Sequence, residues 1–392
     1  MRIGIFVERH WHYGRSICEG VAAFASARDD WRFDFPDWEV LKSQSALRKY
    51  EGFIARVFDE DIADALARTN RPVVDVFGAG FNPAFAIVDQ DSEGIGRMAA
   101  RYFMEHRFSN FSFLGYARHH YSIRRRDAFI VELQDNGFEC REIFEDRHTS
   151  THTLGKTVLK LGHFDFRMNR RSVTDWVLRL PKPCAVFCSH DIVAWNLAKI
   201  CAVAGVRVPE DISILGVGDD PLQCKFNTPS ISSIDSDAFG IGWAAARSLA
   251  EFFDNPGRRP KDFYPPPIGV SERDSTRIFP ISPQWLSDAL MFIRRGINRN
   301  LTASDVFAHL GMSHTPVERV FASKIGHSVQ CEIANVRIET AKRLLEHTRL
   351  SLAEVAKSSG FASKSYFTSK FKAATGKTPG EWRSSSDRSL CR

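Results

Sequence analysis

The sequence lacks the long apolar runs that membrane spans and secretion signals require. No stretch of its 392 residues approaches the roughly eighteen consecutive apolar residues of a transmembrane helix. Its start, MRIGIFVERH, has neither the longer apolar segment nor the small-residue cleavage site of a signal peptide. The 43% hydrophobic content is nevertheless ample for packed cores. We therefore expect a globular, cytoplasmic protein with two or three domains.

Patterns typical of disulfides, metal sites and enzyme active sites are also missing. The eight cysteines are scattered, and Cys184 and Cys188 surround an apolar strand rather than forming a zinc knuckle. The chain has no phosphate-cradling glycine loop, no nucleophile elbow and no paired histidines at metal spacing. We therefore expect buried thiols, no metal, no cofactor and no catalytic residues, so an enzyme is the disfavoured alternative.

Most of the chain lacks a net positive charge, and the excess of basic residues is concentrated near its end. Residues 276–392 contain 18 Lys and Arg against 9 Asp and Glu, a net charge of +9. The remaining residues contain 35 basic and 38 acidic side chains, a net charge of −3. This division predicts a neutral or acidic body that carries a module for a polyanion. A basic surface without a partner is the alternative that charge alone leaves open.

Short runs rich in Val, Ile and Phe alternate with segments of helical spacing through the first 275 residues. The expected strands are 2–7, 52–57, 73–78, 111–116, 185–190 and 212–219, and the expected helices include 15–27, 92–105, 124–136 and 191–204. This alternation predicts parallel sheets covered by helices on both faces, which is a doubly wound α/β architecture. Ligands of such sheets bind beyond the carboxyl ends of the strands.

Polar residues near these strand ends are candidate ligand contacts. They are Tyr13, Arg15, Asp91, Asp191 and Asp219, with Asp220 beside the last. Carboxylates accept hydrogen bonds from hydroxyls and guanidinium groups donate them in pairs, which is the chemistry that holds a small polyol. An Asp next to a helix start is also a common N-cap, and this alternative stays open for Asp191.

The long segment SHDIVAWNLAKICAVAGVRVPEDISILGVGDDP, residues 189–221, resembles the effector domain of LacI/GalR-type repressors. Three shorter segments are similar to further parts of that domain: DSEGIG (91–96), RRDAF (125–129) and ERDST (272–276). The resemblance implies two periplasmic-binding-type lobes with parallel sheets that close on a sugar or sugar-like ligand.

The resemblance also implies roles for individual residues. Asp191 and Asp219 would bind ligand hydroxyls, Arg125 would make a bidentate contact, and Asp91 is a weaker candidate. Trp195 departs from the family pattern, in which a small residue is common at that place. Because the first expected strand begins at residue 2, we expect any DNA-binding module to lie elsewhere than ahead of this domain.

A boundary and an internal repeat mark the last hundred residues. Pro280 and Pro283 interrupt regular structure, and beyond them DVFAHLGMSHTPVERVFASKIG (305–326) is nearly repeated by EVAKSSGFASKSYFTSKFKAATG (354–376). We therefore predict an effector domain at 1–276, a linker at 277–285, an all-α DNA-binding domain at 286–385 and a disordered tail at 386–392.

Each copy of the repeat has the punctuation of two helices joined by a tight turn. Thr302 with Asp305 and Ser351 with Glu354 predict capping boxes at the start of the first helix. Glycines are expected to end that helix in the left-handed conformation, and serines to cap the second; the positions are Gly311, Gly360, Ser313 and Ser363. Helix, glycine turn and helix is the helix-turn-helix motif.

The second helix of each copy predicts one face for packing and one for DNA. Val317, Val320 and Phe321 in the first copy, and Phe367 and Phe371 in the second, form an apolar stripe. The opposite faces carry polar and basic residues suited to phosphate and base contacts: His314, Thr315, Glu318 and Arg319, and Lys364, Ser365, Thr368 and Ser369. A helical hairpin used only for packing is the alternative.

Residues 337–383, RIETAKRLLEHTRLSLAEVAKSSGFASKSYFTSKFKAATGKTPGEWR, resemble the signature of the AraC/XylS family. In that family a long helix, here at about 328–347, joins two helix-turn-helix units that enter successive major grooves of one DNA duplex. A LacI-like body followed by such a domain is an unusual order, and it resembles the xylose operon regulators within this family.

The combined resemblance implies a nucleoid-associated, sugar-responsive transcriptional activator of pentose catabolic genes, with D-xylose as the first candidate effector. The implied partners are double-stranded promoter DNA, a second copy of the chain in a homodimer, and RNA polymerase. The alternatives are a body that only dimerises or one that senses a different small molecule.

Overall fold

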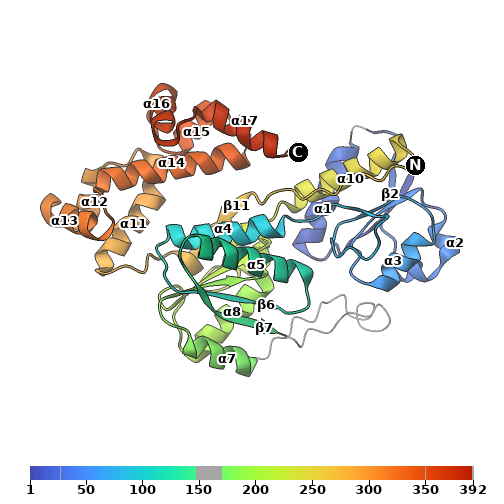
Figure 1. Ribbon diagram of the computed structural model, residues 1–392, viewed down its shortest axis with the longest axis horizontal. Coiled ribbons are helices and arrows are strands. Elements are labelled where there is room, and N and C mark those ends of the chain that lie inside the picture. Colours follow the sequence, from blue (N-terminus) through green and yellow to red (C-terminus); the bar gives the residue numbers. More distant parts are fainter. Residues whose placement is uncertain (27, 147–169, 349, 391–392) are drawn as a thin grey trace. The chain divides into compact units, whose positions relative to one another are not determined.

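The chain folds into two compact units (Figure 1). The computed structural model describes residues 1–26, 28–146, 170–348 and 350–390. Unit 1 comprises Met1–Tyr102 and Asn110–Thr276, and unit 2 comprises Phe103–Ser109 and Arg277–Arg392. The main division therefore falls at the end of the expected effector domain. The short segment Phe103–Ser109 differs from the expectation, because it groups with the second unit.

Unit 1 contains two sheets, one in each lobe. The first has the order β2 (Arg32–Asp34), β1 (Arg2–Phe6), β3 (Gly52–Ala55), β4 (Val73–Asp75), β5 (Ala86–Ile87), and all neighbours are parallel. The second has the order β11 (Gly269–Ser271), β10 (Ser232–Asp235), β9 (Ile212–Val217), β8 (Cys184–Cys188), β6 (Phe111–Tyr116), β7 (Cys140–Asp146). Only the β10–β11 pair is antiparallel among the described strands. The predicted two-lobed α/β fold is confirmed.

Helices cover these sheets and tie the lobes together. The main ones are α1 (His12–Ala25), α3 (Glu60–Ala67), α4 (Ser92–Glu105), α5 (His120–Asp135), α7 (Arg170–Arg179), α8 (Asp191–Ala204) and α10 (Ala238–Asp254). Although α10 follows β10 of the second sheet in the chain, it packs with α1 in the core of the first lobe. A Cβ on Gly20 would lie 2.0 Å from the Phe239 carbonyl oxygen, so this crossing requires glycine.

Unit 2 is all-helical apart from its turns. It contains α11 (Gln284–Gly296), α12 (Ala303–Leu310), α13 (His314–Lys324), α14 (Val329–His347), α15 (Leu352–Ser358), α16 (Lys364–Thr375) and α17 (Pro379–Leu390). The helix α14 matches the long helix expected at about 328–347. The helix α17 runs to Leu390, so most of the segment expected as a disordered tail is helical, while its last two residues lie outside the described residues.

The helix α14 serves two separate cores. Its first half contributes Ile333 and Val336 to a core with α11, α12 and α13. Its second half contributes Ile338, Ala341 and Leu345 to a core with α15 and α16. In Figure 1 the two helix pairs lie toward opposite ends of this helix. Each repeat thus has its own apolar centre, which is what a duplicated supersecondary unit requires.

The predicted helix punctuation is present with one difference. Both capping boxes form, at Thr302 with Asp305 and at Ser351 with Glu354. Gly311 and Gly360 adopt φ of 61° and 76°, in the left-handed region that glycine tolerates. The Ser363 hydroxyl accepts a hydrogen bond from the Tyr366 N–H, whereas Ser313 occupies the N-cap position of α13 without a side-chain bond.

Candidate ligand pocket and nucleic-acid interface

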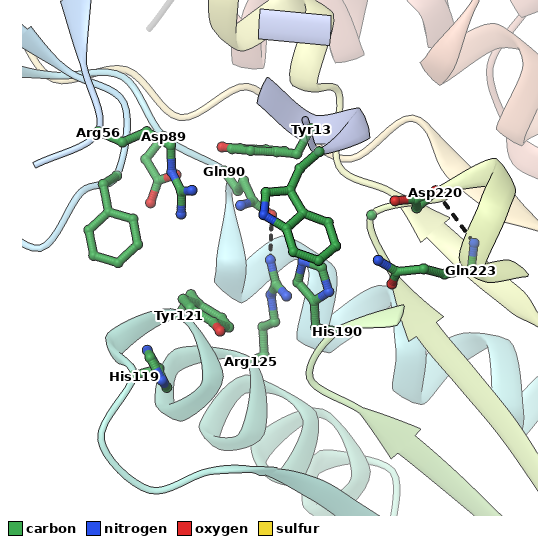
Figure 2. Close-up of a pocket in the computed structure, with 13 residues that line it drawn as sticks. Tyr13, Arg56, Asp89, Gln90, His119, Tyr121, Arg125, His190, Asp220 and Gln223 are labelled. Carbon is green, nitrogen blue, oxygen red and sulfur yellow. Dashed lines mark hydrogen bonds between the residues drawn. The ribbon is translucent and has the colours of Figure 1, made fainter. Parts of the chain in front are cut away.

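A pocket lies in unit 1 where the two lobes meet (Figure 2). Its walls come from the segments that follow strands of both sheets and from the start of α5. The lining residues are Trp11, Tyr13, Arg56, Phe77, Asp89, Gln90, His119, Tyr121, Arg125, His190, Gly218, Asp220 and Gln223. This is the position that an α/β sheet offers to a ligand, because side chains from several strand ends converge there.

Arg125 is the central cation of the pocket. Its side chain is fully buried on α5 and its guanidinium carbon lies 5.1 Å from the centre of the Tyr121 ring. One terminal nitrogen donates to the Ser189 carbonyl and the other to the Gln90 side-chain oxygen, the bond drawn in Figure 2. No residue in the described part of the chain accepts from its Nε. Burial lowers the pKa of Arg125. Its two bonded acceptors are neutral oxygens rather than carboxylates.

The other polar groups of the pocket are mostly neutral donors and acceptors. Burial raises the pKa of the Tyr13 hydroxyl, and it raises that of Tyr121 to about 12. Burial, and then the charge of Arg125, lower the pKa of His190 to about 3, so this imidazole is neutral at physiological pH. Such groups both donate and accept hydrogen bonds, as the hydroxyls of a polyol do.

A second arginine and a carboxylate belong to the first lobe. Arg56 donates to the Glu8 carboxylate at 2.9 Å. Asp89 is buried beside the pocket, and its carboxylate lies 3.7 Å from His120 Nε2. The aromatic rings of Trp11 and Phe77 complete this side. A carboxylate, a guanidinium group and the faces of two aromatic rings therefore line one side of the cavity.

The structure places Asp191 and Asp219 in other contacts. The Asp191 carboxylate is fully buried and accepts from Ser233 Oγ at 2.5 Å and from the Asp220 N–H at 2.8 Å. The Asp219 carboxylate accepts from Arg273 at 2.6 Å and from Ser271 Oγ at 2.8 Å. Both side chains thus join strand ends to one another, and neither lines the pocket.

Two further candidates also have local roles. The Asp91 carboxylate accepts from the Gly94 N–H at 2.8 Å, as a cap for the first turn of α4. Arg15 donates to the carbonyls of Arg9 and His10, which precede α1. Of the seven residues named from the sequence, Tyr13, Arg125 and Asp220 line the pocket. Asp191 is the first residue of α8, and the N-cap position of that helix belongs to His190.

Several pocket residues were not predicted. Asp89 and Gln90 come two and three residues after the end of β5, nearer to the strand than Asp91, so the rule that pointed to Asp91 applies better to them. His190 precedes Asp191 and could have been found in the same way. Arg56 follows β3, whereas Trp11, Phe77 and Gln223 carry no signal of their own in the sequence.

The first predicted DNA-reading face is on α13. His314, Thr315 and Arg319 are exposed, while Val317 and Phe321 are buried on the opposite side. Glu318 differs from its neighbours, because its carboxylate accepts from the Val329 N–H at 3.2 Å and so caps the start of α14. Its side chain is only 22% exposed, with the His314 ring 4.0 Å away.

The second predicted face is on α16. Lys364, Ser365 and Ser369 are exposed, and Phe367 and Phe371 are buried below them. The Thr368 hydroxyl donates back to the Lys364 carbonyl at 2.9 Å. Tyr366, which is half exposed, lies on the same helix with the Lys370 ammonium 5.7 Å from its ring centre. Exposed cations and short donors suit contacts with phosphates and base edges.

Within the described ranges no group of three or more His, Cys, Asp or Glu side chains is arranged to hold a metal ion. Among the helices in the described part of the chain, none is long and apolar enough to cross a membrane.

Comparisons with known protein families match both units. Residues 100–276 match the periplasmic binding protein-like domain, and residues 306–385 match a helix-turn-helix domain. The chain is a DNA-binding transcriptional regulator. The two resemblances drawn from the sequence are confirmed, and the enzyme alternative is set aside because the relatives are regulators.

Two similar proteins match this chain over nearly its full length, and a third matches about two thirds of it. The xylose operon regulatory protein of Haemophilus influenzae is 25% identical over 391 residues, covering 97% of this chain and 98% of its own. A solved structure of the xylose-binding transcription activator XylR has a TM-score of 0.60 at 23% identity, covering 98% of this chain and 97% of its own. A ribose-bound LacI-family regulator from Enterococcus faecium matches 70% of this chain and 98% of its own, with a TM-score of 0.55 at 16% identity.

Proposed function

We propose that the chain is a xylose-responsive regulator that activates pentose catabolic genes. The observation that carries the sugar-binding part is Arg125, a buried guanidinium beside the pocket with no acceptor for its Nε among the described residues. A ligand hydroxyl is a suitable acceptor for that donor. The choice of D-xylose and of activation rests on relatives that are named as xylose operon regulators and as a xylose-binding activator.

The chemistry of the pocket suits a small neutral sugar. A pentose presents hydroxyls that donate and accept, and C–H faces that pack against aromatic rings. Tyr13, Tyr121 and neutral His190 can pair with the hydroxyls, and Asp89 can accept from two of them. Trp11 and Phe77 offer ring faces to the C–H bonds.

The response follows from the two-lobed architecture. Because the lining residues come from both lobes, a sugar that contacts both favours a closed arrangement over an open one. An increase in the closed population then changes DNA binding by α13 and α16 of unit 2. The sugar pocket and the DNA-binding surface are thereby coupled. The regulator acts as a homodimer on promoter DNA, in the cytoplasm on the nucleoid, with RNA polymerase as its further partner.

Titration calorimetry with the full-length protein tests the sensor. D-xylose is expected to bind more tightly than D-ribose, L-arabinose and D-glucose, because relatives are named for xylose. The other sugars differ from it in hydroxyl placement or ring substituents. Arg125→Lys removes the Nε and one terminal nitrogen and is expected to weaken binding by about 2–3 kcal/mol, the cost of a lost charge-assisted bond.

Arg124→Lys is the matched control, because Arg124 is the exposed neighbour on α5. It is expected to bind D-xylose as the wild type does. A wild-type protein that binds no sugar of the panel would leave only the alternatives of a dimerisation body or a different effector. Equal losses in both variants would remove the role assigned to Arg125.

A further inference from the structure

We infer that the last turn of α4 and the linker residue Phe279 form the joint through which the sugar pocket controls DNA binding, with Arg294 as its positioning residue. This inference rests on the proposed function, since it assigns the residues that connect its two activities. The name "joint" is used below for Glu105, His106, Phe279 and Arg294.

One continuous helix connects the pocket with unit 2. Gln90, two residues before α4 begins at Ser92, lines the pocket and accepts a hydrogen bond from Arg125. The same helix ends at Glu105, and the segment Phe103–Ser109, which includes its last turn, belongs to unit 2. A displacement of Gln90 on sugar binding therefore moves an element whose other end is part of the DNA-binding unit, without any loop between them.

The last turn of α4 is held by side chains of unit 2. Arg294, near the end of α11, donates to the Glu105 carbonyl at 3.1 Å, and its guanidinium lies 3.9 Å from the Glu105 carboxylate. A cation at this place caps the free carbonyls of a helix C-terminus and complements the negative end of its dipole. The same guanidinium lies 5.1 Å from the centre of the Phe279 ring.

Phe279 completes the joint by stacking. The His106 ring lies parallel to it, with ring centres 5.1 Å apart and planes inclined by 14°. Both residues are buried, and the Phe279 N–H donates to the Ser287 hydroxyl at 3.1 Å, which anchors the linker to α11. Phe279 also belongs to the core that includes residues of α12 and α13.

The chain also passes from unit 1 to unit 2 after Thr276, and Thr276 is hydrogen-bonded to α4. The Tyr102 hydroxyl and the Thr276 hydroxyl are 2.6 Å apart, and these are the residues at which unit 1 ends before Phe103 and before Arg277. The chain therefore leaves unit 1 from two points that are hydrogen-bonded to each other. Movement of α4 is felt at the start of the linker as well as at its own end.

The test compares DNA affinity with and without sugar in the full-length protein. The probe is a duplex selected by the wild type from a random-sequence pool, and the effector is saturating D-xylose. The wild type is expected to show an affinity ratio in the range of about 5–150-fold, as coupled sites usually do. Arg294→Ala is expected to bring this ratio close to 1, with D-xylose affinity unchanged when no DNA is present.

Phe279→Leu provides a second variant that keeps apolar volume and removes the stacked ring, and it is expected to reduce the ratio in the same direction. Arg295→Ala is the matched control, because Arg295 is the exposed neighbour on α11, and it should keep the wild-type ratio.

An unchanged ratio in Arg294→Ala and Phe279→Leu would overturn the inference. Loss of D-xylose affinity in these variants would also overturn it, because the joint would then support the pocket itself. Failure of the proposed function is separable: the wild type would bind no D-xylose in calorimetry.

Discussion

The two units place their polar side chains in opposite ways. In unit 1 the carboxylates after the strands turn inward, as Asp191 does toward Ser233 and Asp219 does toward Arg273. In unit 2 most of the polar residues of α13 and α16 stay exposed, and Glu318 is the main exception. A parallel sheet must satisfy the polar groups at its strand ends, whereas a short amphipathic helix leaves one face free. Polar residues next to strands can therefore be used by the fold itself, as Asp191 and Asp219 are, whereas most polar residues of α13 and α16 remain exposed.

Among the variants that test this contrast between the two units, Asp219→Ala is expected to have the largest effect. It leaves the mostly buried Arg273 without its carboxylate partner, so we expect the free energy of unfolding of unit 1 to fall by about 3–4 kcal/mol. Urea denaturation of the full-length protein measures the loss. Asp254→Ala, at an exposed position, should change little. A fully stable Asp219→Ala protein that fails to bind sugar would reverse the contrast and make Asp219 a ligand residue.

The next effect is a pH dependence at Asp191. Burial raises the pKa of this carboxyl from 3.8 to about 6, so between these values the folded protein keeps a proton that the unfolded chain has lost. Its stabilising effect is present below pH 3.8 and is lost as the pH rises through 6.

Asp191→Asn does not titrate there. The stability of the wild type relative to this variant is thus expected to fall by about 3 kcal/mol from pH 4 to 7 in thermal denaturation. If the stability of the wild type relative to this variant instead stays constant or rises with pH, Asp191 is ionised throughout and has a partner besides Ser233 and the Asp220 N–H.

A smaller effect is expected on the DNA-reading face. If Arg319 contacts a base, Arg319→Ala should cost about 1–3 kcal/mol at one operator position and leave stability unchanged. Lys364→Ala is the comparison. If Lys364 contacts a phosphate, this variant should bind all sequences less tightly, and the slope of log affinity against log salt concentration should fall by about 1. Competition binding against a set of single-base operator variants separates the two. A uniform loss for Arg319→Ala would assign it to the phosphates.

The smallest effect concerns the exception on α13. Because Glu318 caps α14, Glu318→Ala is expected to lower the stability of unit 2 by about 1 kcal/mol, with little change in base preference. Glu318→Gln keeps an acceptor for the Val329 N–H and should restore most of the loss. A change of base preference in Glu318→Gln would instead return this residue to the reading face.

Strand prediction succeeded where the strands are buried and apolar. The expected runs correspond to β1, β3, β4, β6, β8 and β9. The strands β2, β5, β7 and β11 were missed, and these four form the edges of the two sheets. The strand β10, with the sequence SSID, was missed because its buried serines are satisfied by remote partners such as Thr276 and Asp191. Such a strand has no apolar pattern to find.

What the sequence by itself determined is the local order: an α/β body, a repeated helix-turn-helix module and its capped helices. Periodicity, caps and left-handed glycines act within a few residues, so they are legible along the chain. What only the tertiary structure decided is which polar groups face the pocket. Asp191 and Ser233 are 42 residues apart and Asp219 and Arg273 are 54 apart, so the fold, by bringing these partners together, removes both carboxylates from the pocket and leaves Arg125 facing it.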